Sequence, residues 1–293
     1  MSAARRVLVT GASGQVGTAL LASAPDTCSV RGVRHAEMDI TRHDDVRACI
    51  ADFRPDVIIN AAAYTAVDRA ETESEIAARV NTGGAENLAR AAAAANARLI
   101  HISTDFVFDG QRSSPYRPDD APAPLGVYGA TKLAGERIVR AVLPETATIV
   151  RTAWVYAATG QNFVRTMLRL MRERGRVSVV ADQVGTPTSA GSLAEVLWKF
   201  AARPDLPGTF HWTDAGVASW YDLAMAIAEE ARAAGIIADS PIVEPITTQD
   251  YPTAARRPAY SVLDKRATLA ALGVESIHWR ARLRAVLREI SRA

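Results

Sequence analysis

Short runs of apolar, mostly β-branched residues alternate with longer amphipathic or Ala-rich stretches through the first half of the chain. Such runs are typical of strands buried on both sides, and the stretches between them are typical of helices that cover a sheet. We therefore predict an α/β domain in which a parallel sheet lies between two layers of helices. The expected strands are 6–10, 28–33, 57–60, 99–103 and 148–152, and the expected helices are 16–23, 44–53, 75–96 and 128–142.

After residue 156 the pattern changes, because apolar runs become separated by longer loops and Pro, Trp and Arg become more frequent. Segments 162–174 and 219–234 have the period of amphipathic helices, while 186–188 and 202–208 are rich in turn residues. We expect a first domain over residues 1–156 and a smaller C-terminal lobe over 157–293, with segments at about 177–215 returning to the first domain. A ligand site is expected between them.

Composition excludes several classes of protein. Apolar residues make up 48% and charged residues 23% of the 293 residues, and the net charge of +2 gives no reason to expect nucleic acid as a partner. Two cysteines are too few for a disulfide framework, which favours the cytoplasm. No apolar run has the length of a signal peptide or a membrane span, so no membrane association is expected.

A Gly-x-x-Gly-x-x-Gly motif, formed by Gly11, Gly14 and Gly17, lies between the first expected strand and the first expected helix. Glycines at these positions permit a tight turn and bring the backbone close to a pyrophosphate at the helix N-terminus. A glycine-rich turn also serves any strand-to-helix junction, but its place at the start of a series of βα units favours a cofactor. We therefore predict a Rossmann-type, doubly wound dinucleotide-binding domain.

The residues after the second expected strand bear on the choice between NADH and NADPH. No acid appears there before Glu37, although an NAD site usually has one, and Arg31 or Arg34 could meet a 2′-phosphate. The two residues are equally explained as surface cations of an arginine-rich chain, so both cofactors stay open, with NADPH favoured. Asp39 and Ile40 are expected against the adenine.

Tyr128 and Lys132 are four residues apart, which places both on one face of the expected helix. Only three of the 34 basic residues are lysines, so a lysine in this position is informative. A nearby ammonium stabilises a phenolate and is expected to lower the pKa of the tyrosine, which makes it a better proton shuttle. The lysine can also donate to the cofactor ribose.

Polar residues follow two of the expected strands. Thr104 and Asp105 come at the end of one, where the carboxyl ends of parallel strands face a ligand, and Thr104 could donate to a carbonyl. They could equally cap the chain, but Tyr128 and Lys132 favour reduction of a ketone by hydride transfer.

The small residues Ala62 and Ala63 follow another expected strand. They would let a nicotinamide pass close to the backbone, or they could serve packing alone. The five histidines lack metal-ligand spacing, so no metal is expected.

These motifs resemble those of the extended short-chain dehydrogenase/reductases and, within them, the family of dTDP-4-dehydrorhamnose reductases. The resemblance runs nearly end to end. It is carried by residues 11–17, 60–68, 103–110, 127–136, 151–156, 162–163, 182–188, 251–253 and 257–258.

The resemblance implies NAD(P)H-dependent reduction of the C4 ketone of dTDP-4-dehydro-L-rhamnose to dTDP-L-rhamnose, a precursor for polysaccharide biosynthesis. Tyr128 would donate the proton. Lys132 would adjust the pKa of Tyr128 and hold the cofactor, and Thr104 with Asp105 would contact the sugar and also influence the pKa of Tyr128. The remaining sugar site would include Val67, Trp154 and Arg257. The full cofactor set is Gly11, Gly14, Gln15, Val16, Gly17, Arg34, Asp39, Ile40, Ala62, Ala63, Tyr64, Thr65, Tyr128 and Lys132.

Departures from the family pattern leave alternatives. Some relatives dimerise through magnesium, but the matching region here carries Gln15 and Thr18 and no carboxylate set, so we expect a monomer or a homodimer without a bridging metal. Phe106 follows Asp105, where a sugar-nucleotide dehydratase needs an acid. An epimerase of the same family and a non-catalytic regulatory subunit that binds dinucleotide remain open.

Overall fold

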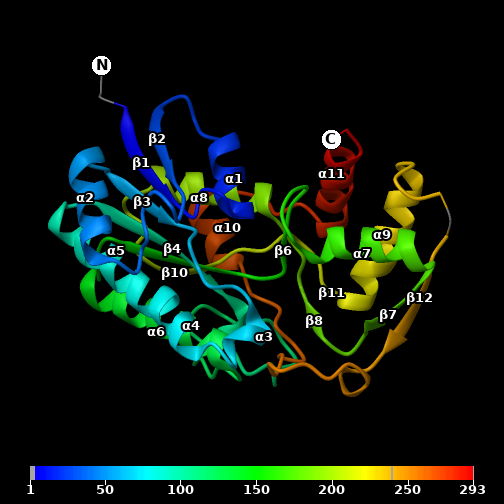
Figure 1. Cartoon of the computed structure of the whole chain (residues 1–293). Helices are drawn as coiled ribbons and strands as arrows, with labels where there is room; N and C mark the ends of the chain where they lie inside the picture. The colour runs from blue at the N-terminus through cyan, green and yellow to red at the C-terminus, as the bar shows by residue number, and fades with distance from the viewer. Residues whose placement is uncertain (1–3, 239, 293) are drawn as a thin grey trace.

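A six-stranded parallel sheet forms the centre of the larger part of the molecule, in the order β10-β5-β4-β3-β1-β2. The computed structural model describes residues 4–238 and 240–292 (Figure 1). The predicted α/β fold with a doubly wound parallel sheet is confirmed. The strands are β1 (Arg5–Thr10), β2 (Cys28–Val33), β3 (Val57–Asn60), β4 (Arg98–Thr104), β5 (Ala147–Thr152) and β10 (Gly208–His211).

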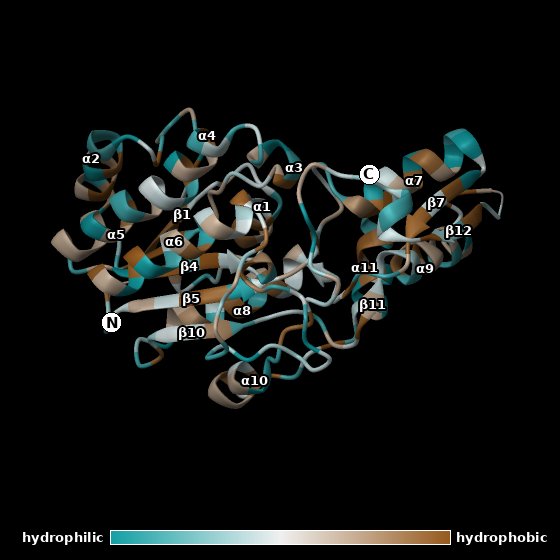
Figure 2. Cartoon of the chain, turned by 90° about the horizontal axis from the view of Figure 1, so that it is seen from below, coloured by the Kyte–Doolittle hydropathy of each residue, from teal (hydrophilic) through white to brown (hydrophobic). Residues whose placement is uncertain are grey.

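Helices cover both faces of this sheet (Figure 1). Successive residues of a strand point to opposite faces, so in β1 Leu8 packs into one apolar cluster while Val7 and Val9 pack into another. The first cluster joins the sheet to α2 (His43–Phe53), α5 (Gly84–Ala94) and α6 (Val127–Val142). The second joins it to α1 (Gln15–Ala22), α8 (Ala190–Ala202) and α10 (Arg266–Leu272). Brown apolar residues run along β4 and β5 in Figure 2.

The smaller lobe has an apolar core of its own. Its helices α7 (Phe163–Arg174), α9 (Trp220–Ala233) and α11 (Trp279–Arg292) pack with the parallel pair β7 (Arg176–Val180) and β12 (Ile242–Ile246). Asn162 and Ser219, expected as first residues of two helices, are instead their caps, because each side chain accepts from a backbone N–H of the first turn. Among the described residues, no helix combines the length and apolar character that crossing a bilayer requires.

Short elements connect these layers. They are α3 (Val67–Ala70), α4 (Ser74–Ala78), a π-helix (Arg79–Gly83), 3₁₀ turns at Asp105–Val107 and Thr248–Asp250, β6 (Val155–Tyr156), β8 (Val184–Gly185), β9 (Thr188–Ser189) and β11 (Ala218–Ser219). β6 pairs with β9 and β8 pairs with β11. Thr188, expected in a turn, therefore begins a two-residue strand.

The chain passes more than once between the two parts. We propose a domain boundary near residue 156, with α8 and β10 as segments that return to the dinucleotide-binding domain. β7 lies in the 177–215 range that was expected to return, yet it pairs with β12 of the smaller lobe. β10 was not predicted as a strand, because its four residues lack a clear alternation of apolar and polar positions.

A buried ion pair ties α6 to the sheet. The guanidinium of Arg151 in β5 donates to both carboxylate oxygens of Glu136 in α6, at 2.9 and 2.7 Å, and the side chains are 3% and 2% exposed. Arg151→Met leaves the carboxylate buried without its partner, so we expect a loss of about 3–5 kcal/mol in the free energy of unfolding, measured by urea denaturation. The double variant Arg151→Met/Glu136→Leu should recover most of this loss. A single variant as stable as the wild type would contradict the expectation.

Candidate active site

The glycine turn between β1 and α1 leaves no room for side chains. Gly11 has φ +66°, and a Cβ atom there would lie 2.7 Å from the backbone of Ala61 and Ala62. A Cβ atom at Gly17 would lie 2.2 Å from the carbonyl oxygen of Gly11. These close approaches bring α1 against the sheet with its N-terminal N–H groups at the carboxyl edge, the arrangement that binds a pyrophosphate.

A cavity of about 310 Å³ lies beside this turn. Seven of the expected cofactor residues line it: Gly11, Gly14, Asp39, Ile40, Ala62, Ala63 and Tyr64. The cavity is also lined by five residues that no motif predicted: Ser13, His35, Met38, Ala61 and Val80. The pKa of Asp39 is lowered although burial opposes this, because the N–H and hydroxyl of Thr41 favour the charged carboxylate. The cavity therefore presents a carboxylate and apolar side chains, which suit a ribose and an adenine.

Other expected cofactor residues have different surroundings. Val16 packs against the sheet, and the side chain of Gln15 accepts from Asn162 Nδ2 at 2.9 Å, which joins the glycine turn to the start of α7. Arg34 and Thr65 are exposed. Their proposed contacts with a dinucleotide therefore stay predictions.

Three buried polar residues support the floor of the cavity. The hydroxyl of Thr10 donates to Asn60 Oδ1 at 2.6 Å, and the N–H of Ala62 donates to the same oxygen at 3.1 Å. Asn60 Nδ2 lies 3.0 Å from His101 Nδ1. Burial, assisted by the charge of Lys132, lowers the pKa of His101 well below its ordinary value, so this ring is neutral and accepts from Asn60. The signal in the sequence was a set of polar residues within or ending apolar strands.

Asn81 fixes the loop that follows β3. Its side-chain oxygen accepts from the N–H of Tyr64 at 2.9 Å, and its nitrogen donates to Tyr64 O and to Thr131 Oγ1 of α6, both at 3.1 Å. Asn81 lies in the π-helix that interrupts the single helix predicted over 75–96. Such insertions are frequent at functional sites, and here the insertion accompanies a buried amide that joins the cofactor loop to α6.

The four expected catalytic residues come together at the carboxyl end of β4. Thr104 ends that strand, and its hydroxyl donates to Oδ1 of the following Asp105 at 3.0 Å. Tyr128 and Lys132 lie in the first two turns of α6, and the ring of Phe106 packs edge-on against Tyr128 at 5.6 Å. Lys132 Nζ donates to the carbonyl of Ile102 in β4 at 2.7 Å.

Burial dominates the electrostatics of this group. It raises the pKa of Asp105 to about 6, against the hydroxyls of Ser261 and Thr104, which favour the carboxylate. Oδ2 of Asp105 is buried and has no partner within hydrogen-bond distance among the described residues. Burial also raises the pKa of Tyr128 to about 12, with Thr104 acting to lower it and the charge of Asp105 acting to raise it.

The expectation that Lys132 lowers the pKa of Tyr128 below its ordinary value is wrong for this structure. Desolvation of the phenol outweighs the favourable contributions, and burial also lowers the pKa of Lys132 itself to about 8, against the charge of Glu136. Tyr128 is therefore protonated at neutral pH. A protonated phenol is the state required of a group that donates a proton to a reduced carbonyl.

Comparison with known proteins identifies the family. The family model described as "RmlD substrate binding domain" matches residues 5–292. The chain belongs to this RmlD family. The resemblance deduced from the motifs is thereby confirmed.

Two relatives of this RmlD-family chain are named as reductases. A dTDP-4-dehydrorhamnose reductase of Aggregatibacter actinomycetemcomitans is 43% identical over 95% of this chain and 97% of its own. A protein of Streptomyces antibioticus, named a probable dTDP-4,6-dihydroxy-2-methyloxan-3-one 4-ketoreductase, is 42% identical over 88% of this chain and 86% of its own.

A solved structure shows the same architecture. The dTDP-4-dehydrorhamnose reductase from Bacillus anthracis, determined in complex with NADP, is 37% identical and has a TM-score of 0.91. The match covers 97% of this RmlD-family chain and 99% of that chain.

The expected sugar-site residues of this RmlD-family protein come from three separate segments. Val67 begins α3, and Trp154 follows β5. Arg257 is already engaged, because its guanidinium donates to both carboxylate oxygens of Asp68 at 3.0 and 2.7 Å, and this lowers the pKa of Asp68. Its contact with a sugar stays a prediction.

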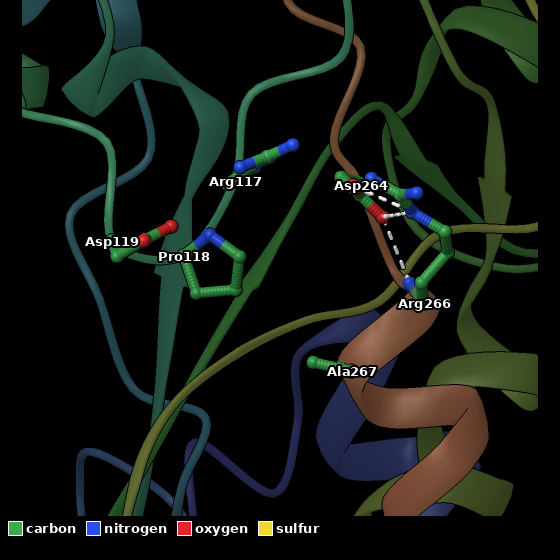
Figure 3. A pocket seen from close by; sticks show the side chains of 6 residues that line it. All are labelled: Arg117, Pro118, Asp119, Asp264, Arg266 and Ala267. Atoms are coloured by element: carbon green, nitrogen blue, oxygen red, sulfur yellow. Dashed lines mark hydrogen bonds and ion pairs between the residues drawn. The ribbon is translucent and has the colours of Figure 1, made fainter.

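A second pocket, of about 290 Å³, lies elsewhere (Figure 3). Its lining comes from Arg117, Pro118 and Asp119 and from residues around the start of α10, where Arg266 binds the carboxylate of Asp264 at 2.5 Å. These segments differ from those that form the catalytic group. Among residues 4–238 and 240–292, no three His, Cys, Asp or Glu side chains are grouped so that they could hold a metal ion.

Proposed function

We propose that this protein reduces the C4 ketone of dTDP-4-dehydro-L-rhamnose with NAD(P)H to give dTDP-L-rhamnose. The observation that carries the proposal is the half-buried, protonated Tyr128, beside Thr104 and Asp105 at the sheet edge that also holds the glycine turn. The reductases that match this RmlD-family chain nearly end to end support the substrate. A 4-ketoreductase among the relatives supports a dTDP-linked 4-keto sugar more broadly.

Each of the four catalytic residues has a separate role in the proposed reduction. The reduced nicotinamide, when bound, supplies the hydride to the carbonyl carbon. The hydroxyl of Thr104, which donates to Asp105 Oδ1 in this structure, would turn to donate to the carbonyl oxygen, and the phenol of Tyr128 delivers the proton that turns this oxygen into the hydroxyl of the product. Lys132, one helical turn away, stabilises the negative charge left on the phenol oxygen. Asp105 contacts the sugar and influences Tyr128 through Thr104.

The glycine turn and its cavity fit a dinucleotide, because the close backbone approaches at Gly11 and Gly17 hold the N-terminus of α1 beside the cavity, where its N–H groups can bind a pyrophosphate. We propose that Gly11, Gly14 and Gly17 shape the pyrophosphate site and that Asp39 with Ile40 receives the adenosine. The nicotinamide half would run past Ala62, Ala63, Tyr64 and Thr65 toward Tyr128 and Lys132. Gln15 and Val16 would contribute the first backbone N–H groups of α1.

The deciding experiment measures the loss of NADPH absorbance with purified protein and freshly generated dTDP-4-dehydro-L-rhamnose, repeated with NADH. We expect stoichiometric oxidation with dTDP-L-rhamnose as the product. Cofactor binding without net oxidation would instead support an epimerase, which regenerates its nicotinamide, or a regulatory subunit.

Cofactor preference provides a separate prediction. Arg31 is paired with Asp52 at 2.6 Å. The side chain of Arg34 is 70% exposed and its distance to Glu37 is longer, 3.8 Å, so Arg34 is more available to a ligand. We therefore expect Arg34→Ala to raise KM for NADPH about tenfold and to leave KM for NADH unchanged, since only NADPH carries the 2′-phosphate. Arg31→Ala is the matched control and should change neither value. Equal effects on the two cofactors would contradict the assignment.

We further propose that the enzyme works in the cytoplasm as a monomer or homodimer. Cys28 and Cys49 are free thiols, which supports a reducing compartment.

A further inference from the structure

Trp154 has an unusual backbone conformation. It follows β5 two residues after Thr152, the residue that pairs with the catalytic Thr104, and its φ is +48°. A bulky residue in the left-handed region is strained and persists only where its neighbours hold it, and such residues gather at functional sites. The carbonyl of Trp154 accepts from the N–H of Thr188 at 3.1 Å, which fixes the backbone in this position.

The indole of Trp154 is held by the smaller lobe. Trp220, the first residue of α9, stacks on it with ring centroids 3.5 Å apart and planes inclined by 6°. Phe163, the first residue of α7, packs against Trp220 at 4.7 Å. The backbone of Gly185 also approaches the indole so closely that a Cβ atom there would lie 2.6 Å from Cε2 and 2.8 Å from Nε1 of Trp154. Trp220 and Gly185 therefore both restrain this one side chain.

Gly185 and Trp220, the two residues that restrain the Trp154 indole, are both connected to the strand pair β8–β11. Gly185 in β8 pairs with Ala218 in β11, and β11 leads directly into Trp220. Trp154 itself follows β5 of the dinucleotide-binding side, two residues after the partner of Thr104, so the stack with Trp220 joins the two parts of the molecule near the catalytic strand end. A change in the position of this strand pair would move the indole relative to Thr104 and Tyr128.

We propose that Trp220 and Gly185 are positioning residues that hold Trp154 as a wall of the sugar pocket. The smaller lobe thereby sets the affinity for the sugar nucleotide. This inference rests on the proposed function. Simple packing of two lobes does not need a strained tryptophan directly after a catalytic strand, whereas a wall that must stay in place does.

Two opposite perturbations test the proposal. Trp220→Ala removes the support and Gly185→Ala pushes against the indole, so we expect each to raise KM for the sugar nucleotide at least about tenfold and to leave the Kd for NADPH within about twofold. Trp220→Phe keeps an aromatic face and should recover most of the affinity. Two stacked indoles couple in far-ultraviolet circular dichroism, and this couplet should be lost in both Trp220 variants.

Matched controls lie in α8. Gly191→Ala introduces a methyl group that meets no heavy atom within 4 Å among the described residues beyond its chain neighbours and the nearby backbone of α8, and Trp198→Phe removes a buried indole whose Nε1 donates to Leu20 O at 3.2 Å. Both controls should retain the couplet and the KM of the wild type.

Two results would overturn the inference. In one, Trp220→Ala loses the couplet while KM for the sugar nucleotide is unchanged. In the other, KM and the Kd for NADPH rise together, as general loosening of the lobes would cause. If the wild type fails to oxidise NADPH, the proposed function fails by itself, and titration with the stable product dTDP-L-rhamnose then tests the wall: binding at least about tenfold weaker in Trp220→Ala supports it, and equal binding overturns it.

Discussion

Replacing Tyr128 by phenylalanine is expected to lower kcat by about 10²- to 10⁴-fold, because the variant keeps the ring and loses the proton donor. The substituted ring would still pack edge-on against Phe106, as the wild-type ring does at 5.6 Å, so the Kd for NADPH should stay within about twofold. Steady-state kinetics gives kcat, and quenching of intrinsic fluorescence gives the Kd.

The control for this variant is Tyr251→Phe, which removes a hydroxyl from an exposed ring and should leave both values unchanged. If Tyr128→Phe kept the kcat of the wild type, the proton would have to come from another group, and the mechanism proposed above would be wrong.

Lys132→Met is expected to lower kcat about 10²-fold and to weaken NADPH binding about tenfold, because the ammonium both stabilises the phenolate and donates to the cofactor ribose. Methionine fills similar space without the charge. The exposed Lys199 of α8 provides the matched control, since Lys199→Met removes one positive charge far along the chain from the catalytic group. If the Kd for NADPH were unchanged in Lys132→Met, the proposed hydrogen bond from Lys132 to the cofactor ribose would be wrong.

The same variant should be more stable than the wild type, which separates loss of function from loss of fold. Burial lowers the pKa of Lys132 from 10.5 in the unfolded chain to about 8, so the folded state disfavours the charged lysine. Below pH 8 the wild type carries this cost fully, and it disappears as pH rises from about 8 to 10.5. The difference between these two pKa values corresponds to about 3 kcal/mol, and the variant also loses the hydrogen bond from Nζ to Ile102 O, which is worth about 1 kcal/mol. We therefore expect Lys132→Met to gain about 2 kcal/mol in the free energy of unfolding at pH 7, and the gain to shrink above about pH 8. Activity and stability then change in opposite directions.

Local patterns determined the larger elements of this fold. Runs such as 57–60 are short and rich in β-branched apolar residues, which favours a strand buried on both faces, and the predicted bounds of β2 and β3 agree with the structure. The glycine motif determined the turn after β1, because the steric freedom of glycine is a property of the residue itself. The spacing of Tyr128 and Lys132 determined that they share a helix face, since that follows from helix geometry alone.

Other features depend on neighbours that are distant in the sequence. The period of 75–96 predicted one helix, but hydrogen bonds from Asn81 to Tyr64 and Thr131 accompany a π-helix within it. The expected pKa of Tyr128 was wrong in direction, because desolvation is a sum over all atoms that surround the phenol and the motif names only one of them.

The surroundings of the expected sugar-site residues also depend on segments that are distant in the sequence. Arg257 meets Asp68, 189 residues earlier in the chain, and Trp154 meets Trp220 from the other lobe. The sequence by itself determined the sheet, the glycine turn and the catalytic helix, because strand period, glycine freedom and helix spacing are local properties. Only the tertiary structure decided the direction in which the pKa of Tyr128 shifts and the position of the Trp154 indole, because burial and stacking arise when segments far apart in the chain pack together.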